Sequence, residues 1–351
     1  MFHQRFYVLS FDDKSVKVLT TCMNKYLNLN FKKKIMKAAI IKEFGSPEVF
    51  EIVDIPKPSI KNNQLLIKVI AVGINPIDWK QRKGNHKFIL GSPFPIVLGY
   101  DVCGEVVETG SEITKFKKGD KVFGVLDNKY GGALAEFAVG HENCFAHQPQ
   151  NISDTEAAAF PMASLTALQA LRDKARLQKG QLVLILGASG GVGHMAVQVA
   201  RILGAKVIAV ASEASKTFVE QFQPDEFIDY QSEDILNIPQ KVDVFFDVAG
   251  IYSFPKCKHL LKPGGVYINT LPRPKILVHK ILQWFTNGKK AKTLLMSHNK
   301  EDLLQIKQWI EENKISVKIG RSFRLEEISE AHNFAQQGHS KGKNVVLINS
   351  K

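Results

Sequence analysis

The segment Gly187-Ala-Ser-Gly-Gly-Val-Gly193 constrains the architecture of this chain more than any other part of the sequence. A continuous apolar run, Val183–Leu186, precedes it, and an amphipathic helical pattern closed by Gly204 follows it. A glycine-rich turn between a buried strand and a helix is the context of the dinucleotide-binding fingerprint. The spacing is G-x-x-G-G-x-G, so Ala188 stands where the strict fingerprint G-x-G-x-x-G has its first glycine. Such turns also serve as simple connections, but the flanking elements favour a bound dinucleotide.

The glycines of this turn have separate predicted roles. Gly190 lets the main chain approach a pyrophosphate, and Gly193 lets the helix pack closely on the strand. A helix that begins near Gly191 points its unpaired N–H groups and the positive end of its dipole at the phosphates. The turn residues expected to contact the cofactor are Ser189, Gly190, Gly191, Val192 and Gly193.

Further apolar runs follow the turn along the chain, and helical patterns separate them. The full set is Val183–Leu186, Lys206–Ala211, Val242–Val248 and Gly265–Thr270. Continuous rather than alternating apolar residues indicate strands buried on both faces of a parallel sheet. Alternating strands and helices of this kind predict an α/β fold with a doubly wound parallel sheet. Ala249 and Gly250 follow the third run, at the end of a strand where cofactors lie in such sheets.

The end of the second run indicates which dinucleotide binds. An NAD-binding domain usually has an Asp or Glu about 20 residues after the glycines, which holds the ribose 2′-hydroxyl. Here the strand ends at Ala211 and Ser212, without an acid at its tip. Ser212 can donate to a 2′-phosphate and Lys216 can supply positive charge, so we predict NADPH as the cofactor. Glu213 is a competing feature, because an inward-pointing carboxylate there would favour NAD.

The chain from Met36 to about Pro161 has a different pattern, with short strands separated by Gly and Pro. Its clearest strands are Leu65–Val72, Val102–Glu108, Lys121–Val125 and Leu134–Val139. This pattern is typical of a compact β-rich domain. Near the C-terminus a helix is predicted around Glu301–Glu312, and Val345–Ile348 is a closing strand that can return to the first domain.

Composition excludes several classes of protein. Hydrophobic residues make up 44% and charged residues 23% of the 351 residues, which are globular proportions. No run of about 18 apolar residues is present, so no membrane-spanning helix is expected. The four cysteines form no closely spaced pair, which favours a reducing compartment. They are Cys22, Cys103, Cys144 and Cys257.

The net charge of +13 first suggests a nucleic-acid partner, but two segments carry nearly all of it. Residues 1–35 contain seven basic and two acidic side chains, and residues 271–300 contain seven basic and no acidic ones. A nucleic-acid-binding protein more often spreads Lys and Arg along a folded face. We therefore interpret the two segments as a basic leader and a solvated helix face, and expect no nucleic-acid partner.

Residues 1–35 lack the apolar core and the cleavage site of a secretory signal, and we expect them to be a disordered N-terminal extension. Their basic, Ser- and Thr-containing composition resembles a mitochondrial leader, although Asp12 and Asp13 count against one. The predicted location is therefore cytoplasmic, with a mitochondrial location as the alternative.

The chain from Met36 to its C-terminus resembles the medium-chain dehydrogenase/reductase superfamily, in particular its zinc-independent branch of quinone oxidoreductases and alkenal or enone reductases. The motifs that carry the resemblance occur in the family's order and spacing. They are Met36-Lys-Ala-Ala39, Gly73-Ile-Asn-Pro-Ile-Asp-Trp79, Gly99-Tyr-Asp101 with Gly104, Gly119-Asp-Lys-Val122, Ala188–Gly193 and Gly342-Lys343. The resemblance implies a homodimer. It also implies a GroES-like catalytic domain, residues 36–160 and 299–351, split around a Rossmann domain, residues 161–298.

The same motifs imply positions in the site. Asn75, Asp78 and Tyr100 match positions that line the nicotinamide cleft in the family. There Asn75 can donate to a carbonyl or brace the cofactor, and Tyr100 can donate its phenolic proton. A turn or capping role is an equal alternative for Asp78. The resemblance also places Thr166 near the nicotinamide ribose and Tyr230 near the adenosine 2′-phosphate.

The resemblance further implies that no zinc is bound. Zinc-bearing relatives have a Cys at the position of Asn75 and Gly-His-Glu at that of residues 99–101. Amide and phenol groups are poor substitutes for thiolate and imidazole ligands. His141, His147 and His194 lack Cys or acidic partners at ligand spacing, so we interpret them as surface or core residues.

Without a Lewis acid, reduction is feasible mainly for acceptors that are already activated, namely quinones and carbon–carbon double bonds conjugated to a carbonyl. We therefore predict an NADPH-dependent, zinc-independent reductase of such compounds. Two alternatives remain, a non-catalytic NADPH-binding protein with an RNA or protein partner and a zinc-dependent alcohol dehydrogenase. The sequence predicts neither the substrate nor the proton donor, because the loops at Gly84–Phe94 and Pro272–Asn287 shape the pocket.

Overall fold

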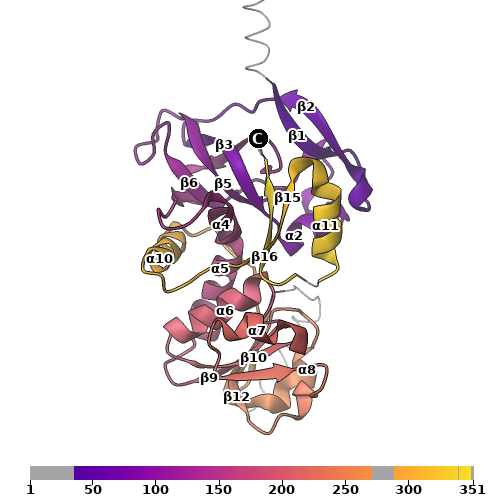
Figure 1. The fold of residues 1–351 in the computed structure, drawn as a ribbon, viewed down its shortest axis with the longest axis vertical. Coiled ribbons are helices and arrows are strands. Elements are labelled where there is room, and N and C mark those ends of the chain that lie inside the picture. The colour runs from indigo at the N-terminus through magenta and orange to yellow at the C-terminus, as the bar shows by residue number, and fades with distance from the viewer. Residues whose placement is uncertain (1–34, 271–287, 339, 349–351) are drawn as a thin grey trace, which may run out of the picture.

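A parallel sheet forms the centre of one lobe of the molecule (Figure 1). The computed structural model describes residues 35–270, 288–338 and 340–348, and within them this sheet has six strands. All five strand pairs are parallel. In sheet order the strands are β11 (Glu226–Asp229), β10 (Lys206–Ala211), β9 (Leu182–Leu186), β12 (Val242–Asp247), β13 (Leu261–Asn269) and β14 (Lys290–Thr293). The four predicted apolar runs are β9, β10, β12 and β13, so this part of the prediction is confirmed.

Alternate residues of β9 face two different hydrophobic clusters. Val183 and Ile185 belong to one cluster, and Leu184 and Leu186 belong to the other. Helix α6 (Gly191–Ile202) supplies residues to the first cluster, and α8 (Phe254–Cys257) supplies residues to the second. The sheet is therefore covered on both faces, which is why its strands are apolar without alternation.

The strand order of this sheet reverses between β9 and β12, which lie side by side. Numbered along the chain, the order is 3-2-1-4-5-6, and ligands of such sheets bind outside the carboxyl ends of the strands at the reversal. The glycine turn follows β9, and Ala249 with Gly250 follows β12. The topology thus places the two predicted cofactor turns next to each other.

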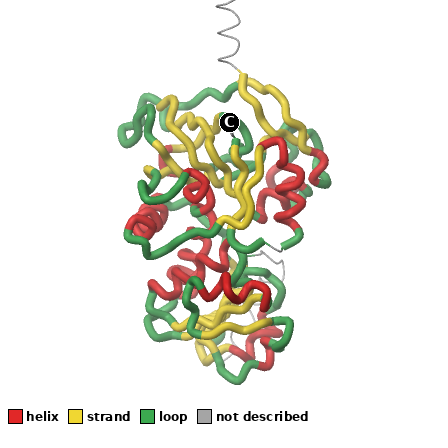
Figure 2. The backbone as a smooth tube through the Cα atoms, in the orientation of Figure 1, coloured by secondary structure: helices red, strands yellow, loops and turns green. Residues whose placement is uncertain are grey.

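The other lobe is built mainly from strands, drawn in yellow in Figure 2, and most of their pairs are antiparallel. Its larger sheet has the order β15-β16-β3-β5-β6-β8 with β7 paired to β3, and its smaller sheet has the order β2-β1-β4. The predicted β-rich domain is confirmed. The strands are β1 (Ile35–Ile41), β2 (Phe50–Pro56), β3 (Gln64–Gly73), β4 (Ile96–Val97), β5 (Asp101–Thr109), β6 (Lys121–Val125), β7 (Phe137–His141), β8 (Phe145–His147), β15 (Ile319–Arg324) and β16 (Lys343–Leu347).

Strand β16 brings the end of the chain back into this sheet. It runs antiparallel to β3, where Val345 lies opposite Gly73, and parallel to β15. The predicted closing strand is confirmed, and the predicted helix near Glu301–Glu312 is α10 (Lys300–Glu311). The division into domains at residues 160 and 299 stays a prediction.

Shorter helices connect the strands and join the two lobes. They are α2 (Pro76–Arg82), α3 (Lys87–Leu90), α4 (Asp154–Ala159), α5 (Pro161–Leu168), α7 (Lys216–Glu220) and α11 (Ile328–Gln336). A π-helical segment, Gln169–Ala175, continues α5. Ser153 begins α4 with a capping box that includes Glu156, which satisfies N–H groups at the helix start. Residues of α4 and α5 pack in one hydrophobic cluster with residues from both large sheets, such as Phe123 and Ile185. The two lobes therefore share a core.

The predictions from charge fall partly outside the described residues. Residues 1–34 and 271–287 are not among them, and the second range includes all of Pro272–Asn287. In residues 288–300, the described part of the basic segment, β14 is an edge strand of the parallel sheet. The prediction of a helix is therefore wrong at Lys290–Thr293. Lysine side chains on an edge strand oppose pairing with a further strand. Across the part of the chain that the structure describes, no helix is long and apolar enough to span a membrane.

Candidate cofactor and active site

The glycine turn has the geometry of a phosphate cradle. Gly190 is the N-cap of α6, and the main chain there is extended (φ −77°, ψ 177°). A Cβ atom built on Gly190 would meet only the Gly187 carbonyl oxygen, at 3.5 Å, so the space beside it is open. A Cβ atom on Gly193 would lie 2.0 Å from the same oxygen, so this glycine is required for close packing. Gly193 therefore has the close-packing role that the sequence predicted, whereas the role of Gly190 beside a pyrophosphate stays a prediction.

The first turn of α6 fits an anion. The first N–H groups of an α-helix have no partner within the helix, and they carry the positive end of its dipole. His194, in this first turn, lies with its Nδ1 2.8 Å from the Gly190 carbonyl oxygen and thereby braces the turn. Burial lowers the pKa of His194 to about 4, so its ring is neutral. Gly190, Gly191 and Val192 are partly exposed at this point, which leaves the helix start accessible to a pyrophosphate.

The turn after β12 lies against the glycine turn. A Cβ atom on Gly187 would be 3.5 Å from the Cβ of Ala249. Asp247, at the end of β12, accepts hydrogen bonds from the main-chain N–H groups of Gly250 (2.7 Å), Ile251 (3.2 Å) and Tyr252 (2.8 Å). These hydrogen bonds to the buried carboxylate hold the turn in place, and burial raises the pKa of Asp247.

The residues predicted at the adenosine 2′-phosphate gather at the tips of β10 and β11. The Tyr230 N–H donates to the Ala211 carbonyl, and the Ser212 hydroxyl lies 3.2 Å from that of Ser215. Lys216 Nζ is 3.8 Å from a carboxylate oxygen of Glu213, whose side chain is 62% exposed. The Glu213 carboxylate therefore lies near the lysine in an exposed position, not in a buried one.

Lys341 adds a second cation to this region. Its ammonium group donates to the Ala214 carbonyl in the loop that follows β10. The sequence pattern did not identify Lys341, because it is separated by more than 100 residues from the loop that it contacts.

A buried polar cluster lies where the larger sheet of the β-rich lobe meets the glycine turn. Its members are Asn75, Asp78, Asp101 and Lys343, each at most 4% exposed. Lys343 Nζ donates to Asn75 Oδ1 (2.6 Å) and to Asp101 Oδ2 (3.1 Å). Asn75 Nδ2 donates to the same Asp101 oxygen (2.8 Å). The structure thus brings Asn75 and Asp78 together, as predicted, and adds two charged residues that the motifs contained without a role.

Asp78 caps the start of α2. One of its oxygens accepts from the Asn75 main-chain N–H (2.7 Å), whereas the other, Oδ1, has no hydrogen-bond partner among the described residues. Burial raises the pKa of Asp78 to about 7, and the nearby Asp101 carboxylate contributes in the same direction. The Asn75 hydrogen bond and the Lys343 charge lower it. The capping role that was an alternative for Asp78 is therefore present.

The Tyr100 hydroxyl is held by two hydrogen bonds within the protein. It donates to the Lys129 carbonyl (2.6 Å) and accepts from the Gln81 side chain (2.6 Å). Burial raises the pKa of Tyr100 to about 12. The phenolic proton of Tyr100 already forms a hydrogen bond with the main chain, so donation to a substrate would first require this hydrogen bond to break.

Thr166 and Asp101 are linked through α5. The Thr166 hydroxyl donates to the Met162 carbonyl (2.6 Å), and the Met162 N–H donates to Asp101 Oδ1 (2.8 Å). The start of α5 is thereby tied to the buried cluster. Thr166 lies on the same short helix, with 7% of its surface exposed.

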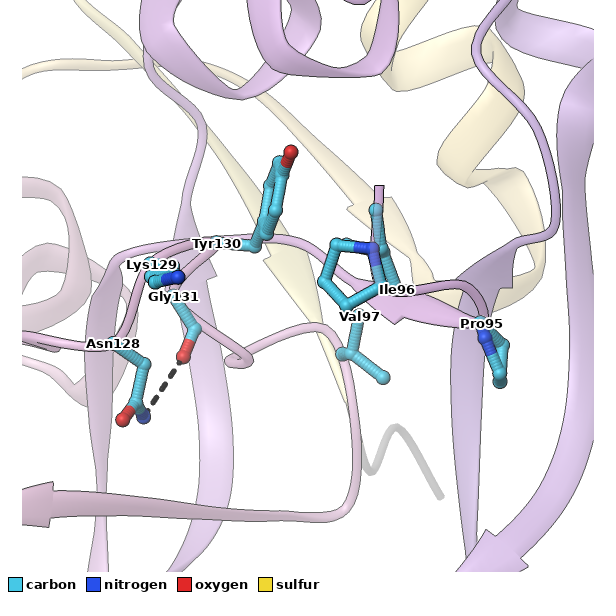
Figure 3. Close-up of a pocket in the computed structure, with 8 residues that line it drawn as sticks. Pro95, Ile96, Val97, Asn128, Lys129, Tyr130 and Gly131 are labelled. Carbon is cyan, nitrogen blue, oxygen red and sulfur yellow. Dashed lines mark hydrogen bonds between the residues drawn. The ribbon is translucent and has the colours of Figure 1, made fainter. Parts of the chain in front are cut away.

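An open pocket of about 240 Å³ lies in the β-rich lobe, close to Tyr100 (Figure 3). One wall is Pro93, Pro95, Ile96 and Val97, and the other is Asn128–Gly131. The Asn128 amide donates to the Gly131 carbonyl (3.1 Å), which holds the second wall in a turn. The first wall includes the end of the predicted pocket loop Gly84–Phe94, whereas Pro272–Asn287 lies outside the described residues.

The three histidines have ordinary roles in this structure. His194 is buried, His141 accepts from the Asn143 N–H, and the exposed His147 lies 3.3 Å from the Lys115 carbonyl oxygen. Within residues 35–270, 288–338 and 340–348, no group of three or more His, Cys, Asp or Glu side chains could hold a metal ion.

Two family profiles match separate parts of the chain. One, described as an alcohol dehydrogenase GroES-like domain, matches residues 61–150. The other, described as a zinc-binding dehydrogenase, matches residues 223–346. The first range lies in the β-rich lobe, and the second begins in the Rossmann-like sheet and ends in β16.

Characterised relatives are similar over nearly the whole chain. A chloroplast envelope quinone oxidoreductase homolog from Arabidopsis thaliana is 36% identical over 324 residues, which cover 89% of this chain and 98% of the relative. An NADPH-dependent alkenal/one oxidoreductase of the chloroplast, from the same plant, is 32% identical and covers 89% and 80%. The solved quinone oxidoreductase of Coxiella burnetii is 34% identical, with a TM-score of 0.84 and coverage of 90% and 100%.

The two glycines of the cradle predict opposite mutant behaviour. Gly190→Ala should fold with unchanged stability, because its Cβ meets nothing closer than 3.5 Å, but the methyl group should weaken NADPH binding about tenfold or more. Gly193→Ala should lose stability by a few kcal/mol, because its Cβ would overlap a main-chain oxygen. Thermal unfolding and fluorescence titration with NADPH measure the two effects. Unfolding of Gly193→Ala at the wild-type temperature would contradict this geometry.

Asp78 predicts a pH-dependent change in stability. The folded protein keeps a proton on Asp78 up to about pH 7, whereas in the unfolded chain the pKa is 3.8. The folded state therefore binds more protons between these values, so the stability from this group is full below pH 3.8 and is lost as pH rises through 7. Asp78→Asn keeps an acceptor for the Asn75 N–H and removes the titration. Its melting temperature should rise relative to wild type between pH 5 and pH 8, and parallel curves for the two proteins would refute the assignment.

Proposed function

Because the chain belongs to the medium-chain dehydrogenase/reductase superfamily and is an oxidoreductase of its quinone and alkenal/one oxidoreductase branch, we propose that it uses NADPH to reduce quinones or α,β-unsaturated carbonyl compounds without a metal. The observation that carries the cofactor choice is the tip of β10. Among the described residues no buried acid stands at this tip, and two cations, Lys216 and Lys341, contact or approach the loop that follows it. A 2′-phosphate gains from this charge, and an unphosphorylated ribose does not.

The proposed cofactor residues follow the carboxyl ends of four parallel strands, apart from Thr166, which lies on α5. Ser189–Gly193 would hold the pyrophosphate at the start of α6. Ser212, Lys216 and Tyr230 would hold the adenosine 2′-phosphate, and Ala249, Gly250 and Thr166 would contact the nicotinamide half. When bound, NADPH supplies a hydride from C4 of its nicotinamide ring.

The proposed catalytic residues act mainly by position. Asn75 and Asp78 lie at the start of α2, and Tyr100 supports the wall of the nearby pocket through Lys129. The Asn75 amide and the Tyr100 hydroxyl already donate within the protein, and Asp78 is only 1% exposed, so we assign the three to shaping the cleft and excluding water. The proton that completes the reduction would come from water.

Two other functions are less well supported. A zinc-dependent alcohol dehydrogenase needs three protein ligands at the metal, and Asn75 stands where zinc-bearing relatives have a Cys. The second alternative is an NADPH-binding protein without activity, in which the basic segments would bind RNA or a protein partner. The homodimer and the cytoplasmic location both remain predictions, since the similar plant proteins are chloroplast proteins by name.

A screen of electron acceptors tests this function. Purified full-length protein should oxidise NADPH when a quinone, an enal or an enone is added, and should turn over more slowly with NADH. Metal analysis of the same sample should find far less than one zinc per chain. NADPH binding without oxidation by any acceptor, together with salt-sensitive RNA binding, would favour the non-catalytic alternative. About one zinc per chain would overturn the metal-free mechanism.

Lys216→Ala tests the cofactor preference. The exposed ammonium interacts with a phosphate only through solvent-screened charge, so its loss should raise the KM for NADPH roughly three- to tenfold. NADH lacks the 2′-phosphate and serves as the internal control, with a KM that should stay within about twofold. An equal rise for both cofactors would remove the proposed role of Lys216.

A further inference from the structure

Lys343 is a buried cation at the boundary of the two lobes. Only 3% of its side chain is exposed, and its ammonium group lies between Asn75 Oδ1 (2.6 Å) and Asp101 Oδ2 (3.1 Å). A lysine is rarely buried without a charged partner, because transfer of the charge from water is costly. Asp101, which is fully buried, is that partner.

The stem of Lys343 lies against the glycine turn. A Cβ atom on Gly191 would be 2.9 Å from Lys343 Cδ, so the absence of a side chain at Gly191 makes room for the lysine. The neighbouring Gly342 N–H donates to the Ser189 carbonyl (2.8 Å). One end of the lysine is therefore fixed on the predicted phosphate cradle, and the other end reaches the start of α2.

This contact determines which way the Asn75 amide faces. Its oxygen accepts from Lys343, and its nitrogen donates to Asp101 (2.8 Å) and to the Gly73 carbonyl (3.3 Å). An amide with its oxygen and nitrogen exchanged would place its N–H groups against an ammonium group. The charge of Lys343 thus excludes the reversed amide, and Asn75 is held in one orientation.

We propose that Lys343 is a positioning residue for the reduction, which sets the start of α2 and the Asn75 amide at a fixed place relative to the glycine turn. This inference rests on the proposed function, because it concerns the same site. It gives a role to a residue whose stem lies against the predicted pyrophosphate turn, while its ammonium group binds Asn75 and Asp101. A purely structural role for the Lys343–Asp101 pair is the competing explanation.

Variants that change the buried charge distinguish a positioning role of Lys343 from a purely structural one. Lys343→Met removes the cation, leaves the buried Asp101 carboxylate without its partner and should strongly destabilise the fold. Adding Asp101→Asn removes that charge while an amide oxygen still accepts from the Met162 N–H. The new amide nitrogen then faces Asn75, which favours the reversed Asn75 amide. The double variant should therefore regain thermal stability and keep Asn75 in the wrong orientation.

Kinetics and hydrogen exchange of the Lys343→Met/Asp101→Asn variant form the test. The melting temperature should return to near that of wild type, and kcat should be about tenfold to hundredfold lower, as expected when reactants are misplaced. The dissociation constant for NADPH should change less than about threefold, because the main-chain cradle is untouched. Main-chain amides of residues 73–82 should also exchange faster than in wild type, with or without any acceptor.

Wild-type kcat and wild-type exchange in the stable double variant would overturn the inference and leave Lys343 with a structural role only. Failure of the wild-type protein to reduce any acceptor would count against the proposed function instead, and the exchange measurement would still decide the role of Lys343. Lys262→Met is a control for the loss of a lysine–aspartate pair elsewhere, since Lys262 pairs with Asp243 at 2.7 Å near the starts of β12 and β13. It should change neither kcat nor exchange at residues 73–82.

Discussion

The close approach of Gly193 to the Gly187 carbonyl is the constraint on which the site depends. A single methyl group at Gly193 would lie 2.0 Å from that oxygen, so α6 can start where it does only with glycine there. The position of α6 then sets where its free N–H groups point and leaves room at Gly191 for the Lys343 stem. Through Lys343 the same contact reaches Asn75, in the other lobe. Backbone packing in one lobe thus fixes polar geometry in the other.

The parallel sheet could be predicted from the sequence because the evidence for it lies within each strand. A strand without polar residues cannot belong to a sheet that has one face in solvent. A strand such as Val183–Leu186 has no polar residue to turn toward solvent, so it must be covered on both faces. Once four such strands alternate with helices, the strand order and the place of its reversal are strongly limited. The glycine turn, Ser212 and Tyr230 follow strand ends, and for that reason the structure brings them to one edge of the sheet.

The buried cluster could not be predicted in the same way. Lys343 and Asn75 are separated by 268 positions, and nothing near either residue indicates that they touch. The hydrogen bond of the Tyr100 hydroxyl could not be predicted from the sequence either, because it depends on the path of the loop that carries the Lys129 carbonyl. The edge strand at Lys290–Thr293 was misjudged as helix, since four residues rich in lysine have weak strand character and gain their place from pairing with β13.

The buried cluster at the start of α2 is polar, and its hydrogen bonds explain why apolar side chains could not replace it. Well-packed apolar side chains usually stabilise a buried position at least as well as an ion pair does. A site that must hold an amide in one orientation cannot use them, because only hydrogen-bond donors and acceptors distinguish the oxygen of Asn75 from its nitrogen. Lys343 presents donors to Asn75, and Asp101 presents acceptors, so the two charges together leave one arrangement. Asp78 lies in the same cluster, and one of its oxygens has no hydrogen-bond partner among the described residues. Burial and the neighbouring Asp101 carboxylate raise the pKa of Asp78, and the charge of Lys343 lowers it. The lysine therefore acts on both residues at the start of α2, on one through a hydrogen bond and on the other through charge.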